Sequence, residues 1–346
     1  WASICAADSD RQFVDVDLSW PGHLQALADE GFDIWEINEG VVTAYASPQE
    51  IAFMEERGMD WRASERFSAE DIRRATDGYR ELSEYEAELQ RWNSEYPDLT
   101  TLTTIGTTHE GRDIYLLKIS DNATVDEDEP EVLFIGLQHA REWMAGATLH
   151  GIVDRLLSTA STAPEAARFV NEMEIFVVLV ANPDGYVYTH TTERLWRKNR
   201  RDNENGTFGV DLNRNFPFAW EQQTANTSSN VYRGPAPKSE PETKALDNWV
   251  TSRGANLVGC INYHSFGNLI LHSWAYTTDT APNEEDMFGL TVDMKDAMAP
   301  VHGQNFDPGS WGVVLGYTGG GVTDDTFHAT YGIPTITCEV RPDSGG

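Results

Sequence analysis

The stretch EVLFIGLQHAREWMAGATL, at residues 131–149, decides the fold of this chain. Its first part is an almost unbroken apolar run, which predicts a strand buried on both faces, and its last part repeats apolar residues at helical spacing. A polar turn with His139 and Glu142 lies between them. Ligands bind beyond the carboxyl ends of strands in open α/β sheets, so this imidazole and carboxylate are candidate metal ligands. The pair alone is weak evidence, because a surface histidine and a helix-capping glutamate give the same pattern.

Composition limits the class of protein. The 346 residues, 40% of them hydrophobic, are enough for one large core or two, and the chain has no apolar run long enough to span a membrane. A formal charge of −31, from 56 acidic and 25 basic residues, disfavours nucleic acid and anionic membranes as partners and attracts cationic peptides. The same charge fits two origins that the sequence leaves open, a high-salt habitat and an ordinary acidic secreted protein.

We predict a small separate unit at residues 1–66. Alternating strand patterns, helical spacing and a capped segment at 47–58 give the order strand, helix, strand, strand, helix, which indicates an α+β sandwich. Residues 67–76 form a connecting segment, and the arginines there would allow a trypsin-like protease to cut. The remainder, 77–346, is then a second and larger unit.

Strands and helices alternate in the second unit. Apolar runs at 173–181, 257–263 and 333–338 predict further buried strands, and the last two lead directly into His264 and Glu339. The expected fold class is α/β, a mixed and largely parallel twisted sheet flanked by helices. Right-handed crossovers would bring these strand ends to one edge, beside the polar turn described above.

The side chains at this edge suit catalysis with a metal. Two imidazoles and one carboxylate that leave one position open are typical of catalytic zinc, and His139, Glu142 and His264 supply that set. A zinc-bound water has a pKa of about 7, so a nearby carboxylate, for which we choose Glu339, can take its proton. The oxyanion that follows needs a fixed cation, and Arg197 is our candidate.

Six blocks of sequence carry a family resemblance. They resemble the signature blocks of the zinc metallocarboxypeptidases of the pancreatic carboxypeptidase A/B type, and the match runs in order through 77–346. The small unit resembles the activation segment of that family, which covers the active-site cleft of the precursor. The blocks are HARE at 139–142, NPDGYVYTH at 182–190, RLWRKNR at 194–200, GVDLNRNF at 209–216, NYHSF at 262–266 and TCEVR at 337–341.

The resemblance implies the same zinc ligands, general base and oxyanion residue as the chemistry above, and it adds others. Asn213 and Arg214 would grip the free carboxylate at the C-terminus of a peptide or protein substrate, which makes the enzyme an exopeptidase. Tyr317 would close over the substrate. Asp211 would accept a hydrogen bond from the ring of His139.

Further residues concern specificity. By the same resemblance Arg141 and Phe266 would line the next subsite. The residue just before Asp325 is usually apolar in A-like members and Asp in B-like ones, and here it is Asp324. Gly312 matches a small residue that leaves room for a long side chain. A buried carboxylate at the pocket floor needs a cation, so we expect substrates that end in Lys or Arg.

Two other functions stay open at this point. A zinc amidohydrolase of the same fold, acting on acylated amino acids or cell-wall peptides, would need neither Tyr317 nor Asp324, and a non-catalytic peptide-binding relative would not need Glu339. We expect a secreted monomer that a protease activates. The resemblance also implies non-proline cis peptides at Ser265-Phe266 and Ser273-Trp274. Family members continue through a further helix beyond the last strand, so we expect the chain to be clipped there.

Overall fold

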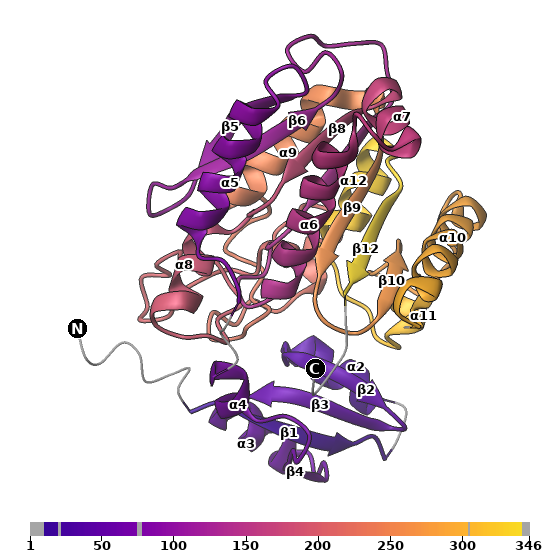
Figure 1. The fold of residues 1–346 in the computed structure, drawn as a ribbon. Coiled ribbons are helices and arrows are strands. Elements are labelled where there is room, and N and C mark those ends of the chain that lie inside the picture. Colours follow the sequence, from indigo (N-terminus) through magenta and orange to yellow (C-terminus); the bar gives the residue numbers. More distant parts are fainter. Residues whose placement is uncertain (1–9, 20–21, 75–77, 304, 341–346) are drawn as a thin grey trace.

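The computed structural model describes residues 10–19, 22–74, 78–303 and 305–340 (Figure 1). A small unit, built by the first part of the chain, faces the strand ends of a larger unit. Cys5 and residues 75–76 of the connecting segment lie outside the described residues. Within the described part of the chain, no helix combines the length and the apolar character needed to cross a membrane.

The small unit is a four-stranded antiparallel sheet with two helices. The predicted capping box is confirmed, since the Ser47 hydroxyl accepts from the Glu50 amide at 3.2 Å and the Glu50 carboxylate accepts from the Ser47 amide at 2.7 Å. The strand order is β2-β3-β1-β4, and its three-residue edge strand was not predicted. The elements are β1 (Gln12–Asp17), α2 (His23–Glu30), β2 (Ile34–Asn38), β3 (Val41–Ala46), α3 (Pro48–Glu56) and β4 (Trp61–Ala63).

The larger unit contains an eight-stranded mixed sheet in the order β11-β10-β12-β9-β7-β8-β6-β5. The four central strands, from β12 to β8, are parallel to one another, and β5 and β6 form an antiparallel hairpin at one edge. The strands are β5 (Thr100–Thr107), β6 (Asp113–Ile119), β7 (Glu131–Ile135), β8 (Glu174–Val178), β9 (Leu257–His264), β10 (Leu269–His272), β11 (Asp307–Ser310) and β12 (Thr335–Glu339).

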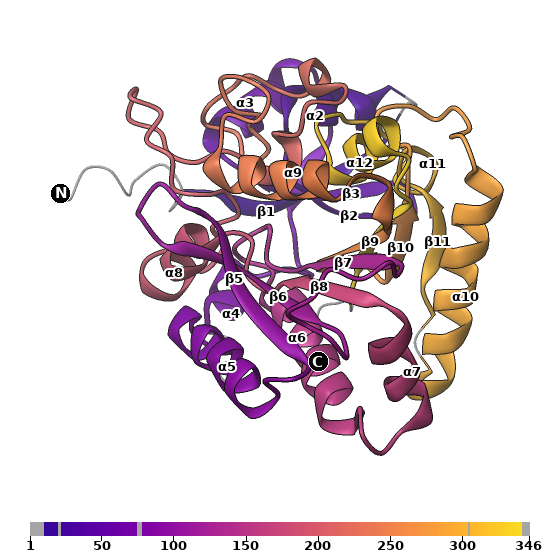
Figure 2. The same cartoon turned by 90° about the horizontal axis from the view of Figure 1, so that it is seen from above.

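Helices cover both faces of this sheet (Figure 2). On one face, side chains of α5, α6 and α7 pack against β7 and β8, and on the other face α9 and α12 pack against the same strands. The helices are α4 (Ala69–Arg74), α5 (Leu82–Glu95), α6 (Trp143–Thr159), α7 (Pro164–Glu172), α8 (Pro183–Thr191), α9 (Pro241–Arg253), α10 (Glu284–His302), α11 (Trp311–Val314) and α12 (Thr323–Tyr331). This arrangement confirms the predicted fold class.

The approach of α9 to β5 requires a glycine. A Cβ added to Gly106 would lie 2.7 Å from the Cβ of Ala245, which is closer than real Cβ contacts come. The two cis peptides expected from the resemblance, Ser265-Phe266 and Ser273-Trp274, are present.

Candidate active site

Neighbouring strands bring the predicted residues together. His264 is the last residue of β9 and Glu339 is the last residue of β12, and the two residues pair directly in the parallel register. His139 and Glu142 lie in the turn between β7 and α6, and β7 is the other neighbour of β9. Segments more than a hundred residues apart in sequence therefore meet at one edge of the sheet.

His139, Glu142 and His264 form a buried cluster of metal-ligand atoms. The Nδ1 atoms of His139 and His264 are 3.0 Å apart, and the two oxygens of Glu142 lie 2.8 and 2.9 Å from them. Atoms that each lie about 2.0–2.2 Å from one shared ion are only a little farther from one another than the atoms of this cluster. One ligand atom from each of the three residues lies within 4.8 Å of the other two, so the cluster could hold a single ion.

Hydrogen bonds around the cluster favour a cation within it. Asp211 Oδ1 lies 3.0 Å from Nε2 of His139, which places the ring proton on Nε2 and leaves a lone pair on Nδ1. Two ring nitrogens and two carboxylate oxygens then lie close together. Lone pairs outnumber the protons that could form hydrogen bonds among these atoms. Such a donor set of two imidazoles and one carboxylate is the set that catalytic zinc prefers. The structure therefore places Asp211 where its predicted role requires.

Arg197 is tied to the same group of residues. Its Nε donates to Asp211 Oδ2 at 3.0 Å, and its Nη1 lies 3.4 Å from Glu142 Oε1. Burial disfavours the charged guanidinium, but these carboxylates outweigh it and raise the pKa of Arg197. The residue is thus a fixed cation beside the ligand cluster.

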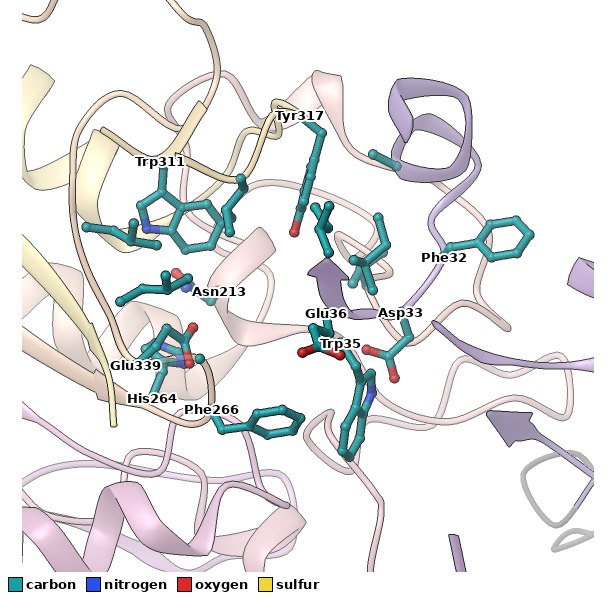
Figure 3. Close-up of a pocket in the computed structure, with 18 of the residues that line it drawn as sticks. Phe32, Asp33, Trp35, Glu36, Asn213, His264, Phe266, Trp311, Tyr317 and Glu339 are labelled. Carbon is teal, nitrogen blue, oxygen red and sulfur yellow. The ribbon is translucent and has the colours of Figure 1, made fainter. Parts of the chain in front are cut away.

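A cavity of about 320 Å³ opens beside the cluster. Figure 3 shows Glu339 and His264 on one side of it, with Tyr317 and Asn213 along the wall. Arg214 also lines the cavity, and its Nε has no hydrogen-bond partner among the described residues. Five residues predicted from the sequence, contributed by β9, β12, the 3-10 helix η1 (Leu212–Arg214) and the loop before α12, therefore share one space.

The surroundings of Glu339 disfavour the charged form of its carboxyl group. Burial raises the pKa of its carboxyl group, and the charge of Glu142 raises it further, against the lowering effect of Arg197. Tyr317 is also buried, which raises the pKa of its phenol and keeps the hydroxyl neutral. Both groups line the cavity.

The two predicted specificity residues lie outside this cavity. Asp324, in the first turn of α12, is 1% exposed; its Oδ2 accepts from Thr337 at 2.8 Å and its Oδ1 has no partner among the described residues. Burial raises the pKa of Asp324 well above its usual range. A Cβ on Gly312 would lie 2.6 Å from the carbonyl oxygen of Thr277, so this glycine is required by backbone packing.

Residues of the small unit line one part of the cavity. Asp33, between α2 and β2, accepts two hydrogen bonds from Arg141 at 2.6 and 2.7 Å, and both side chains are buried. Trp35 lies over the Arg141 guanidinium at 4.5 Å and edge-on to Phe266 at 5.2 Å (Figure 3). Sequence reasoning did not single out Asp33 or Trp35, although both stand in the segment GFDIWEI.

Further contacts hold the small unit in place. Ser229 donates to the carbonyl of Gly31 at 2.6 Å, and Asn230 donates to Asp33 at 2.9 Å. Gly31 has φ +87°, and a Cβ there would lie 2.4 Å from a methyl of Thr224, so a glycine is needed for this approach. Near the connecting segment, Arg73 pairs with Glu193 at 3.2 Å.

Comparison with known proteins agrees with this geometry. The zinc carboxypeptidase family matches residues 85–345. Carboxypeptidase O of Bos taurus is 36% identical over 267 residues, which cover 75% of this chain and 70% of that protein. Carboxypeptidase B of Astacus astacus is 33% identical over 272 residues, 77% of this chain and 87% of that protein.

A solved structure matches over both units. The crystal structure of the carboxypeptidase A from Helicoverpa armigera has a TM-score of 0.83 and 25% identity, and the match covers 97% of this chain and 90% of that chain. The chain therefore belongs to the zinc carboxypeptidase family and is a zinc-dependent peptide hydrolase.

Proposed function

We propose that this chain is the latent precursor of a carboxypeptidase that removes Lys or Arg from the C-termini of peptides. Residues 77–346 are the catalytic unit, residues 1–66 the activation unit and residues 67–76 the segment between them. The observation that carries the proposal is the convergence of the ligand cluster, Glu339 and Arg214 on one cavity that the small unit closes. We also propose that the enzyme acts outside the cell as a monomer.

The proposed chemistry assigns one task to each side chain. Zinc held by His139, Glu142 and His264 would polarise the scissile carbonyl and acidify a water molecule. Glu339, with its raised pKa, takes a proton from the attacking water and gives it to the leaving amine. Arg197, a buried and permanently charged group, stabilises the oxyanion.

Arg214 and Asn213 account for cleavage at the chain end. The buried guanidinium of Arg214 has an unpartnered Nε and lines the cavity, so it can bind a carboxylate that a mid-chain peptide bond lacks. Asn213 is held beside it, because its Oδ1 accepts from the Thr323 amide at 2.9 Å. Tyr317 supplies a neutral hydroxyl across the same cavity. Phe266 lines the cavity and Arg141 lies against Trp35, and we propose that both contact the next substrate residues.

Asp324 supports the preference for basic ends. The described residues offer no ion-pair partner to this buried carboxylate, whereas the family resemblance places it at the floor of the side-chain pocket. A Lys or Arg side chain that reaches it would supply the missing charge. In the structure Asp324 is not among the residues that line the cavity, and we propose that a substrate side chain reaches it when the pocket is occupied.

The test compares two substrates before and after trypsin. We expect little hydrolysis by the intact chain, and after cleavage a kcat/KM for peptides ending in Arg well above that for peptides ending in Phe. Asp324→Asn should lower the Arg value by about 100-fold or more, because a buried guanidinium without a counter-charge costs about 3–5 kcal/mol. Equal rates on both substrates would refute the specificity, and full activity without cleavage would refute latency.

A further inference from the structure

A second cluster of metal-ligand side chains lies outside the cavity. His109 stands in the turn between β5 and β6, while Glu240 and Glu242 stand at the start of α9. One ligand atom from each lies within 4.8 Å of the other two, and His109 Nε2 is 2.8 Å from Glu240 Oε2. None of the three lines the catalytic cavity.

The two carboxylates are fully buried and short of positive charge. Both are 0% exposed. Asn199 Nδ2 donates to Glu240 at 2.8 Å and to Glu242 at 3.1 Å. Glu240 also accepts from the Ser239 hydroxyl at 2.6 Å and from Arg201 at 3.2 Å. Arg201 and His109, whose pKa Glu240 raises, both pair with Glu240, whereas no ion pair with Glu242 is found among the described residues. A charge buried without a partner costs several kcal/mol.

Glu242 carries the observation that points to a ligand. Its Oε1 is buried and has no hydrogen-bond partner among the described residues. Burial raises the pKa of Glu242 to about 7, so the carboxylate becomes available to a cation from neutral pH upward. A cation that joins the cluster would satisfy the oxygen and balance the charge together.

We propose that His109, Glu240 and Glu242 bind a second divalent cation of the zinc class. One imidazole nitrogen and two carboxylate oxygens are ligands that such ions accept, and a water could fill the fourth position. The side chain of His109 is 30% exposed, which gives the ion a path from solvent.

The space needed is small. Two ligands about 2.0–2.1 Å from a tetrahedral ion lie about 3.3 Å apart, so His109 must move by roughly half an ångström from Glu240. His109 lies in a surface turn, whereas both glutamates are fixed by the hydrogen bonds described above. The bound ion would join the β5–β6 turn to the start of α9 and stabilise that edge of the sheet.

The experiment adds Zn²⁺ to the full chain already loaded with one zinc. Calorimetric titration at pH 8, with metal analysis after dialysis, counts the added equivalents. We expect wild type to bind one further Zn²⁺ and its Tm to rise. The Glu242→Gln and His109→Ala variants should lose this equivalent or bind it at least tenfold more weakly. Glu285→Gln, which removes an exposed carboxylate on α10, is the matched control and should behave as wild type.

Two outcomes overturn the proposal. One is a wild-type chain that takes up no second equivalent. The other is a second equivalent of unchanged affinity in either variant, which would place the ion elsewhere. If Glu242→Gln fails to fold, the surface variant His109→Ala decides alone. The readout is metal uptake, so the result does not depend on catalytic activity.

Discussion

The proposed latency depends on the contact between Asp33 and Arg141, and removal of this contact is a sharp test. The two side chains form a buried, bidentate pair at 2.6 and 2.7 Å. Loss of one partner of such a pair costs about 3–5 kcal/mol, because the other charge stays buried alone. This corresponds to roughly 150- to 4,000-fold in the equilibrium between closed and open forms.

The Asp33→Ala variant should therefore be active before proteolysis. Other contacts between the two units, such as that of Ser229 with Gly31, remain in this variant and still stabilise the closed form in part. We accordingly expect kcat/KM of the intact variant to exceed that of the intact wild type by at least about tenfold on a blocked peptide ending in Arg. After trypsin the two proteins should have equal activity, since residue 33 is then gone from the catalytic unit.

Asp17→Ala is the matched control. Asp17 also belongs to the small unit, but it is half-exposed and pairs with the exposed Arg62 at 3.1 Å. We expect this variant to stay as latent as wild type. If intact Asp33→Ala is no more active than wild type, or if Asp17→Ala is activated equally, the reasoning on this contact is refuted.

Three more predictions follow from other contacts. Asp211→Ala should weaken zinc binding about 10- to 100-fold, as measured by competition with a chelator, because the ring of His139 loses its orienting acceptor. Burial alone would raise the pKa of Asp33, but Arg141 outweighs it and holds this pKa well below its usual range. The contact is then fully present above about pH 4 and lost only in stronger acid, so activity assays of the intact chain should show latency from pH 8 to pH 5, and activation near pH 6 would contradict this. Gly106→Ala should lower the free energy of unfolding by about 1–3 kcal/mol in urea titrations, since α9 leaves no room, whereas Gly151→Ala, in open space, should not.

The sequence predicts the catalytic edge because strand ends are easy to recognise. Apolar runs that stop at His264 and Glu339 place both residues at one edge of a parallel sheet, and the structure pairs them directly. The fold class follows from the same patterns. The strand β4 was missed, because three residues carry too little periodicity to be distinguished from a loop.

Contacts between the units could not be predicted. Asp33 is one of 56 acidic residues, and nothing in its local pattern indicates a partner at position 141. The position of Asp324 relative to the cavity could not be predicted from the sequence either, because it depends on how α12 packs on β12. The cluster of His109 with Glu240 and Glu242 forms only because α9 packs on β5. The sequence alone does not reveal this packing.

Anomalous scattering at the zinc edge, from crystals of the zinc-loaded chain, tests the central claim most directly. We predict a zinc ion about 2.0–2.1 Å from Nδ1 of His139 and of His264, with a Glu142 oxygen as third ligand and Glu339 near the ion without binding it. An empty cluster, or Glu339 as a fourth ligand that closes the site, would contradict the account.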